Sequence, residues 1–148
     1  MEKFDKNITT IFVTGPNGSG KTSTMEELAD EFPLQLISPV FFGEPFLMTS
    51  FDWSQKAFVI DEVSKWDLVS LIKQLPLIEE VCYSSNKKLV LIADYKEQYG
   101  PLSDMLRNDK IFVEFFDRES PVEVYHEGNL VQFPEFKNAE IFLNLLNA

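Results

Sequence analysis

The stretch GPNGSGKT at residues 15–22 constrains this chain most, because a turn so rich in glycine needs a structural reason. The run ITTIFVT just before it is short, β-branched and aromatic, which predicts a buried strand over residues 8–14. After it, apolar residues of the segment 25–32 recur at i, i+3, i+4 and i+7, which predicts a helix that Pro33 ends. A strand, a flexible turn and a helix in this order gather backbone amides and the positive end of a helix dipole around one anion.

Four positions in this turn, Gly15, Gly20, Lys21 and Thr22, satisfy the P-loop pattern GxxxxGK[ST]. The pattern suits phosphate chemistry because the lysine reaches the β and γ phosphates and the threonine hydroxyl ligates Mg²⁺. ATP and Mg²⁺ are therefore the predicted ligands. The expected nucleotide-binding residues are Gly15, Pro16, Asn17, Gly18, Ser19, Gly20, Lys21, Thr22 and Ser23.

Two adjacent acids close the apolar run KAFVIDE at residues 56–62. Asp61 is expected to hold Mg²⁺ through water or through the Thr22 hydroxyl, so that Thr22 and Asp61 form the metal site. Glu62 is expected to face the γ-phosphate and to orient a water molecule for in-line attack. A glutamate beside the metal aspartate is typical of P-loop enzymes that hydrolyse ATP to do mechanical work.

Asp94 and Arg107 join Lys21 and Glu62 as the expected catalytic residues. Asp94 ends the apolar run at residues 89–93, where such enzymes usually carry an uncharged polar residue. Because an ionised carboxylate repels a triphosphate, Asp94 either contacts the attacking water or a base, or caps the next helix. The chain has only two arginines, too few for the clamps of small-molecule kinases. Arg107 is predicted to reach the nucleotide of a neighbouring subunit, the alternative being an ordinary surface arginine.

The charge of the chain is strongly acidic. Twenty-four carboxylates against thirteen bases give a formal net charge of −11, which repels nucleic acid unless the bases are concentrated in one place. Lys87 and Lys88 are the candidate nucleic-acid residues: they form either a solvated loop or, in a ring of six subunits, a positive pore. The single cysteine, Cys82, and the single histidine, His126, are expected to be packing residues.

The remaining pattern predicts an α/β fold. Further strands are expected over residues 34–38, 56–62, 89–93 and 111–116, joined by an irregular connection at 39–53. A capping box at 64–67 is expected to start a helix whose buried stripe includes Leu68 and Leu71, and Pro76 is expected to break or restart that helix. A hairpin around Glu127-Gly128 and a helix bearing Phe136, Ala139, Leu143 and Leu146 follow. We expect one domain over residues 1–148, with a mostly parallel, helix-covered core at about 8–116 and an appendage at about 117–148.

The order of GPNGSGKT, FVIDE, LVLIADY and LRNDKIFVEF resembles P-loop NTPases of the ASCE group, and within it the superfamily 3 helicase domain of viral and plasmid replication initiators. By this resemblance, Lys21 and Thr22 are the P-loop residues, Asp61 and Glu62 the paired acids, Lys87 or Lys88 the DNA-contacting lysine, Asp94 the sensor and Arg107 the trans arginine. Asp94 stands where that family has asparagine. A second resemblance, through FVTGPNGSGKT and IDEVSKW, is to the Zot-type assembly ATPase of filamentous phages. Either implies a sheet ordered 5-1-4-3-2 and action as an oligomer.

Three functions remain open from the sequence. The first is an Mg²⁺-ATP-dependent motor on single-stranded nucleic acid, a homo-hexamer serving viral or mobile-element replication or packaging. The second is a small-molecule kinase, and the third is a regulatory ATP-binding module that presents its aromatic segment 41–53 or its last helix to a protein. No run reaches the eighteen or so apolar residues of a membrane span and no signal peptide is recognisable, so a cytoplasmic location is expected, the host cytoplasm for a viral protein.

Overall fold

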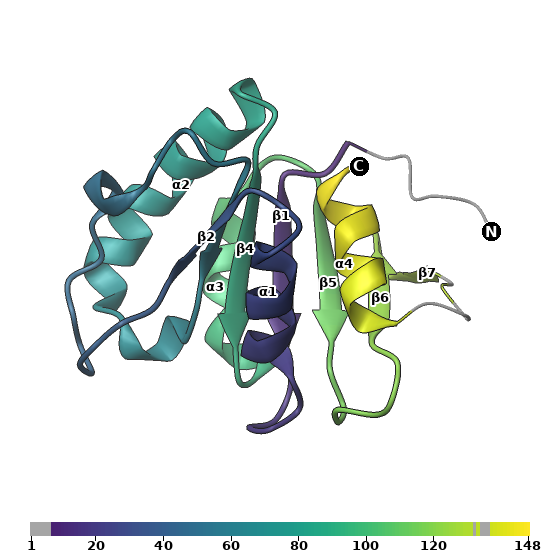
Figure 1. Cartoon of the computed structure of the whole chain (residues 1–148). Helices are drawn as coiled ribbons and strands as arrows, with labels where there is room; N and C mark the ends of the chain where they lie inside the picture. Colours follow the sequence, from purple (N-terminus) through teal and green to yellow (C-terminus); the bar gives the residue numbers. More distant parts are fainter. Residues whose placement is uncertain (1–6, 132, 134–136) are drawn as a thin grey trace.

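The computed structural model describes residues 7–131, 133 and 137–148, and its centre is one seven-stranded sheet (Figure 1). The strands lie in the order β2-β3-β4-β1-β5-β6-β7. Their bounds are β1 Thr10–Thr14, β2 Leu34–Ile37, β3 Ala57–Ile60, β4 Lys88–Ala93, β5 Lys110–Glu114, β6 Glu123–His126 and β7 Asn129–Val131. The first five strands pair in parallel, so the predicted order 5-1-4-3-2 is confirmed when the sheet is read from β5. The predicted hairpin around Glu127-Gly128 is confirmed as β6–β7, and it pairs antiparallel with β5, so that it extends the same sheet.

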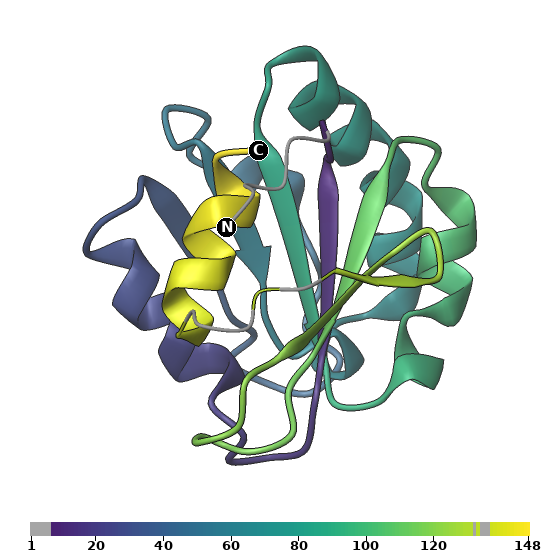
Figure 2. The same cartoon turned by 90° about the vertical axis from the view of Figure 1, so that its right-hand side faces the viewer.

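Helices cover both faces of the sheet, as the buried character of the parallel strands requires. Their bounds are α1 Lys21–Ala29, α2 Leu68–Ser84, α3 Gly100–Met105 and α4 Asn138–Leu146, with short 3₁₀ turns η1 Met48–Ser50, η2 Val63–Lys65 and η3 Lys96–Gln98. Figures 1 and 2 show α1 and α4 on one face and α2 and α3 on the other. Two apolar clusters match these layers: one contains Met25 of α1 and Phe142 of α4, and the other contains Leu71 of α2 and Leu102 of α3.

Helix α2 corrects two predictions. It runs without interruption through Pro76, which is exposed, and it begins after Asp67. The side chain of Asp67 is the N-cap and accepts a hydrogen bond from the Val69 amide. Of the segment 64–67 that was expected to form a capping box, Ser64 and Lys65 lie in η2 instead, and Leu68 is exposed. The buried stripe consists of Leu71, Leu75, Ile78, Glu79 and Cys82.

The two remaining amphipathic helices keep their predicted places with changed details. Helix α1 ends at Ala29, which is exposed, while Phe32 is buried just beyond it. In α4 the most deeply buried residues are Ile141, Phe142, Leu145 and Leu146, whereas Ala139 and Leu143 pack at the edge of the cluster. The predicted contribution of Phe136 lies outside the described residues.

The connection between β2 and β3 is irregular, as expected, and divides into a buried and an exposed part. Phe46 and Phe51 are buried, and Phe46 packs edge-on against Trp66 with ring centroids 5.2 Å apart. Phe41 and Phe42 are exposed. Within the part of the chain that the structure describes, no helix combines the length and apolar character needed to cross a membrane.

Candidate functional site

The candidate site lies at the carboxyl edge of the sheet, where β1, β3 and β4 end side by side. Parallel pairing of β4 with both β1 and β3 brings the turn after Thr14, the acids after Ile60 and the residue after Ala93 to one edge. A cavity of about 290 Å³, here called the P-loop pocket, is lined by residues 17–23 together with Glu26, Asp61, Glu62, Ile92, Asp94 and Arg118. The topology therefore gathers the predicted phosphate turn, both paired acids and Asp94.

The glycine turn has the backbone that its sequence predicts. Gly18 and Gly20 have φ angles of 80° and 99°, in the left-handed region that favours glycine. Gly20 is the N-cap of α1, so the helix begins at Lys21 with its amino end at the pocket. Because the first amides of a helix lack intrahelical partners, this arrangement suits an anion.

Lys21 is buried and its ammonium group is held by two groups of the same site. It donates to the carbonyl oxygen of Gly15 and lies 3.1 Å from Oδ1 of Asp94. The sequence left two roles open for Asp94, and this contact with a base is one of them. Asp94 does not cap the following turn η3, because the N-cap residue of that turn is Tyr95.

Thr22 and Asp61 meet directly in the P-loop pocket. The Thr22 hydroxyl donates to Oδ2 of Asp61 across 2.9 Å, and the Glu62 amide donates to Oδ1 of Asp61 across 2.8 Å. Burial raises the pKa of the Asp61 carboxyl, while the hydrogen bond from Thr22 opposes that shift. A hydroxyl and a carboxylate oxygen side by side are hard ligands of the type that Mg²⁺ takes, so the donor set fits this ion. The indole N–H of Trp66 donates to the Asp61 carbonyl across 2.9 Å, which helps to hold the loop in place.

Glu62 lines the same pocket in an unusual backbone conformation. Its φ of 51° and ψ of 55° are left-handed, a region that costs a residue with a side chain about 1 kcal/mol or more. Its carboxylate lies 3.0 Å from the ammonium of Lys65, and both side chains are about half exposed. Such a surface pair is weak, so it leaves the glutamate able to turn toward a ligand.

The structure does not bring Arg107, Lys87 or Lys88 to this site. Arg107 and Lys87 precede a parallel strand and Lys88 begins one, so all three lie at the amino edge of the sheet, opposite the P-loop. Lys88 is buried and donates to the Ile8 carbonyl, and burial lowers the pKa of its ammonium. Lys88 therefore cannot present its charge to a nucleic acid in this conformation. Lys87 donates to the Gln55 carbonyl across 2.6 Å.

Arg107 is exposed, and its backbone is held by a hydrogen bond to a side chain of α2. The carboxylate of Glu79 accepts hydrogen bonds from the amides of Arg107 and Asn108 across 3.0 and 3.1 Å. A trans role for the Arg107 side chain stays a prediction.

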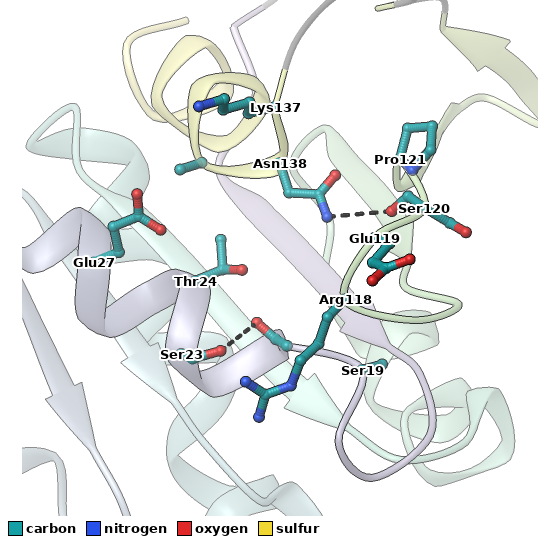
Figure 3. Close-up of a pocket in the computed structure, with 12 residues that line it drawn as sticks. Ser19, Ser23, Thr24, Glu27, Arg118, Glu119, Ser120, Pro121, Lys137 and Asn138 are labelled. Atoms are coloured by element: carbon teal, nitrogen blue, oxygen red, sulfur yellow. Dashed lines mark hydrogen bonds between the residues drawn. The ribbon is translucent and has the colours of Figure 1, made fainter.

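Arg118, which the sequence reasoning did not select, lies at the site. Its Nε donates to the Gly18 carbonyl across 3.1 Å. Its side chain lines both the P-loop pocket and a neighbouring cavity of about 570 Å³, whose lining residues Figure 3 shows. This side cavity lies between the start of α1, the loop 117–121 and the start of α4. The sequence held one signal: Arg118 follows β5, whose carboxyl end lies beside the end of β1.

Cys82 and His126 lie away from the P-loop pocket. Cys82 is buried, and burial raises the pKa of its thiol to about 12, which keeps it protonated. His126 is nearly buried, with its Nε2 2.9 Å from the Asp109 carboxylate and 3.9 Å from that of Glu127. These three side chains could share a metal ion, but the His126–Asp109 pair accounts for their closeness.

The strand order, the glycine turn between β1 and α1, and the acids after β3 define an α/β fold of the P-loop NTPase type. No family model and no curated protein sequence matches the chain. Three similar solved structures are of Pif1 helicases. Pif1 from Bacteroides sp. in complex with ADP-AlF4 has 17% identity and a TM-score of 0.44, over 77% of this chain and 39% of that one.

The other two similar structures give comparable values. A structure of two coordinating Pif1 helicases at forked double-stranded DNA has 18% identity and a TM-score of 0.46, over 76% of this chain and 40% of the other. Unliganded Pif1 from Bacteroides sp. has 19% identity and a TM-score of 0.43, over 96% and 42%. The chain thus spans about two fifths of these helicase chains. Likeness at this level assigns neither a family nor an activity, and function has to come from the site.

Proposed function

We propose that this chain binds ATP with Mg²⁺ and hydrolyses it. The observation that carries the proposal is the 2.9 Å contact between the Thr22 hydroxyl and Asp61, in the same pocket as the buried ammonium of Lys21. A metal-binding hydroxyl, a metal-binding carboxylate and a phosphate-binding cation at the start of one helix are the parts that a P-loop hydrolase requires.

In this proposal each residue has a separate task. Amides of the turn and the amino end of α1 bind the phosphates, and Lys21 exchanges its present contacts for phosphate oxygens. Glu62 leaves the weak pair with Lys65 and accepts a hydrogen bond from the attacking water, which orients that water in line with the γ-phosphate. Thr22 and Asp61 would hold Mg²⁺, which when bound neutralises charge that develops on the phosphates.

Asp94 has a task that follows from its contact with Lys21. While the site lacks phosphate, the Asp94 carboxylate keeps the ammonium at the pocket. Once Lys21 moves to the nucleotide, Asp94 is free to accept a hydrogen bond from the attacking water, which is the sensor role expected from the sequence.

The side cavity is large enough for a ribose and a base beside the phosphates.

The first test compares ATP binding and hydrolysis by the wild type, Lys21→Ala and Glu62→Gln. Lys21→Ala is expected to lose nucleotide binding, while Glu62→Gln is expected to bind ATP and to hydrolyse it at least a hundredfold more slowly, since general base catalysis contributes about 10² to 10⁴. Lys73→Ala, an exposed lysine of α2, is the control and should match the wild type. Normal hydrolysis by Glu62→Gln would contradict the assignment.

The finer proposal is that hydrolysis drives movement on single-stranded nucleic acid in a homo-oligomer, a hexamer if the chain is a motor. It is supported by the paired acids Asp61 and Glu62, and it needs a source of positive charge that a single subunit of net charge −11 offers poorly. The rate of ATP hydrolysis should therefore rise when single-stranded DNA or RNA is added, and this stimulation should fall steeply with salt. The molar mass of the protein in solution should increase when ATP and Mg²⁺ are present. A monomer without stimulation would contradict the motor.

A second candidate is an ATP-binding module that acts on a protein partner. It is favoured by the exposed apolar residues Val40, Phe41 and Phe42, whose segment joins the Glu62 loop through a hydrogen bond from the Gly43 amide to the Lys65 carbonyl. A partner on these residues would contact the loop that carries the proposed base. The third possibility, a small-molecule kinase, would be revived by transfer of labelled phosphate to a nucleoside rather than to water.

A further inference from the structure

Arg118 is held at the P-loop by its own local structure. In the loop 117–121, the Asp117 carboxylate accepts hydrogen bonds from the amides of Glu119 and Ser120 across 2.8 and 2.6 Å, and from the Ser120 hydroxyl across 2.9 Å. These bonds lower the pKa of the Asp117 carboxyl, so it stays ionised at neutral pH. The loop is thereby shaped before any ligand arrives.

The side chain of Arg118 crosses the beginning of α1. Its Cγ lies 3.7 Å from the point where a Cβ on Gly20 would stand, and its Nε donates to the Gly18 carbonyl. In Figure 3 the guanidinium extends from the loop toward Ser23. Across the described residues, no carboxylate forms an ion pair with this guanidinium. Its two terminal nitrogens therefore remain available as donors.

The electrostatics of the P-loop pocket make this cation significant. Its charged lining residues are two cations, Lys21 and Arg118, and four acids, Glu26, Asp61, Glu62 and Asp94. Lys21 already lies against Asp94. A polyphosphate entering so acidic a pocket needs a further positive charge, and Arg118 is the described lining residue that can supply it without breaking an ion pair.

The position along the pocket indicates which phosphate Arg118 contacts. Lys21, Thr22 and Asp61 occupy the end suited to the β and γ phosphates and Mg²⁺. The P-loop pocket and the side cavity share four residues, Ser19, Gly20, Ser23 and Arg118, which mark the boundary between phosphates and nucleoside. Ser19 is buried, and its hydroxyl has no hydrogen-bond partner within the described part of the chain. An unpaired buried hydroxyl at this boundary is itself a binding group for a ligand oxygen.

We propose that Arg118 binds the α-phosphate of the nucleotide within its own subunit, at the boundary between the two cavities. This inference rests on the proposed nucleotide function and adds a residue to it. Because the α-phosphate is unchanged during hydrolysis, Arg118 binds the ground state and the transition state equally, so it acts on affinity rather than on turnover.

The test measures the affinities for ATP, ADP and AMP, each with Mg²⁺, together with kcat and KM for ATP. Arg118→Ala is expected to weaken all three nucleotides by the same factor, about tenfold to hundredfold, which is the usual effect of losing a charged hydrogen bond. KM should rise by a similar factor with kcat nearly unchanged. Arg118→Lys should recover part of the affinity, because it keeps the charge and loses the planar fork. Lys73→Ala is the surface control, and circular dichroism verifies that each variant is folded.

The outcomes separate this inference from the proposed function. Wild-type protein that binds no nucleotide overturns both. Wild-type binding with unchanged affinity in Arg118→Ala overturns only the role of Arg118. A loss restricted to ATP with lower kcat would place Arg118 at the γ-phosphate instead. Recovery of hydrolysis on mixing Arg118→Ala with Lys21→Ala would show that it acts across a subunit boundary, which also contradicts the proposal.

Discussion

Gly15 shows how a single residue joins the P-loop to the loop that carries Arg118. A Cβ at this position would lie 2.7 Å from Phe115 Cβ, 2.8 Å from the Phe115 carbonyl oxygen and 2.9 Å from Ser19 Oγ. Phe115 is itself fixed, because its amide donates to the Thr14 carbonyl and its ring stacks on Phe142 of α4. The glycine is therefore required by packing.

Gly15→Ala is expected to lower the free energy of unfolding by about 1–3 kcal/mol, as other overpacked substitutions do. Urea unfolding would measure the change. Gly100→Ala is the matched control, because a Cβ there meets nothing within 4 Å, and it should leave stability unchanged or raise it by about 0.4–1 kcal/mol. Equal stability of Gly15→Ala and the wild type would show that Phe115 moves aside at little cost.

Residues of the site were predictable from sequence where they follow a recognisable strand. The glycine turn, Asp61, Glu62 and Asp94 each end an apolar run, and parallel strands gather such ends. Arg118 was missed because its place after β5 was the one signal in the sequence, and no motif surrounds it. The interpretation of Lys88 failed for a different reason: it was treated as part of a polar link, whereas the structure makes it the buried first residue of β4.

At the scale of elements, helix α2 is notable because it runs through an exposed proline. Proline has no amide hydrogen for the carbonyl four residues earlier, and its ring crowds that carbonyl. In α2 the apolar residues Leu71, Leu75 and Ile78 lie on both sides of Pro76 and are fully buried. Packing of this face against the sheet holds the helix together, so the sequence rule that proline ends a helix was overruled by tertiary contacts.

Pro76→Ala should therefore stabilise the protein, by about 1–3 kcal/mol, since alanine is about 3 kcal/mol better than proline inside a helix and no buried contact is lost. The midpoint of urea unfolding should rise. Lys73→Ala, one turn earlier on an exposed position, should change stability by less than about 0.5 kcal/mol. A lower midpoint for Pro76→Ala would indicate that the native helix needs the proline ring.

Other elements show the same division between local and distant causes. The parallel strands were predictable because they are short, largely apolar runs, and in β1, β3 and β4 every residue is buried. The start of α2 was not, because the backbone bond from Gly43 to Lys65 and the bridge between Glu44 and Trp66 hold η2 apart from the helix. Pairing with a segment about twenty residues away leaves no mark in a local pattern.

The whole molecule carries a formal net charge of −11, with 24 acidic and 13 basic side chains. Like charges this numerous repel one another in the compact state more than in the expanded unfolded chain. Salt shortens the range of that repulsion to about 3 Å at 1 M, from about 10 Å at 0.1 M. The folded state should therefore gain from added salt.

Raising NaCl from about 0.1 to 1 M at pH 7.5 is expected to increase Tm by a few degrees. Thermal unfolding followed by circular dichroism measures it. The same titration near pH 4.5, the isoelectric point of the sequence, is the control and should give a smaller increase because the net charge there is close to zero. A fall in Tm at pH 7.5 would mean that attractive ion pairs outweigh the repulsion.

The hydrogen bond from the Trp66 indole to the Asp61 carbonyl makes the fluorescence of Trp66 a reporter of changes in the loop that carries Asp61. Indole emission depends on the polarity and hydrogen bonding of its surroundings, and this indole is attached to the loop that bears the acids. Trp53, the other tryptophan, packs against Phe51 and Phe58 and supplies a steady background. The native chain thus contains its own fluorophore beside the candidate site, and events there can be followed without a chemical label.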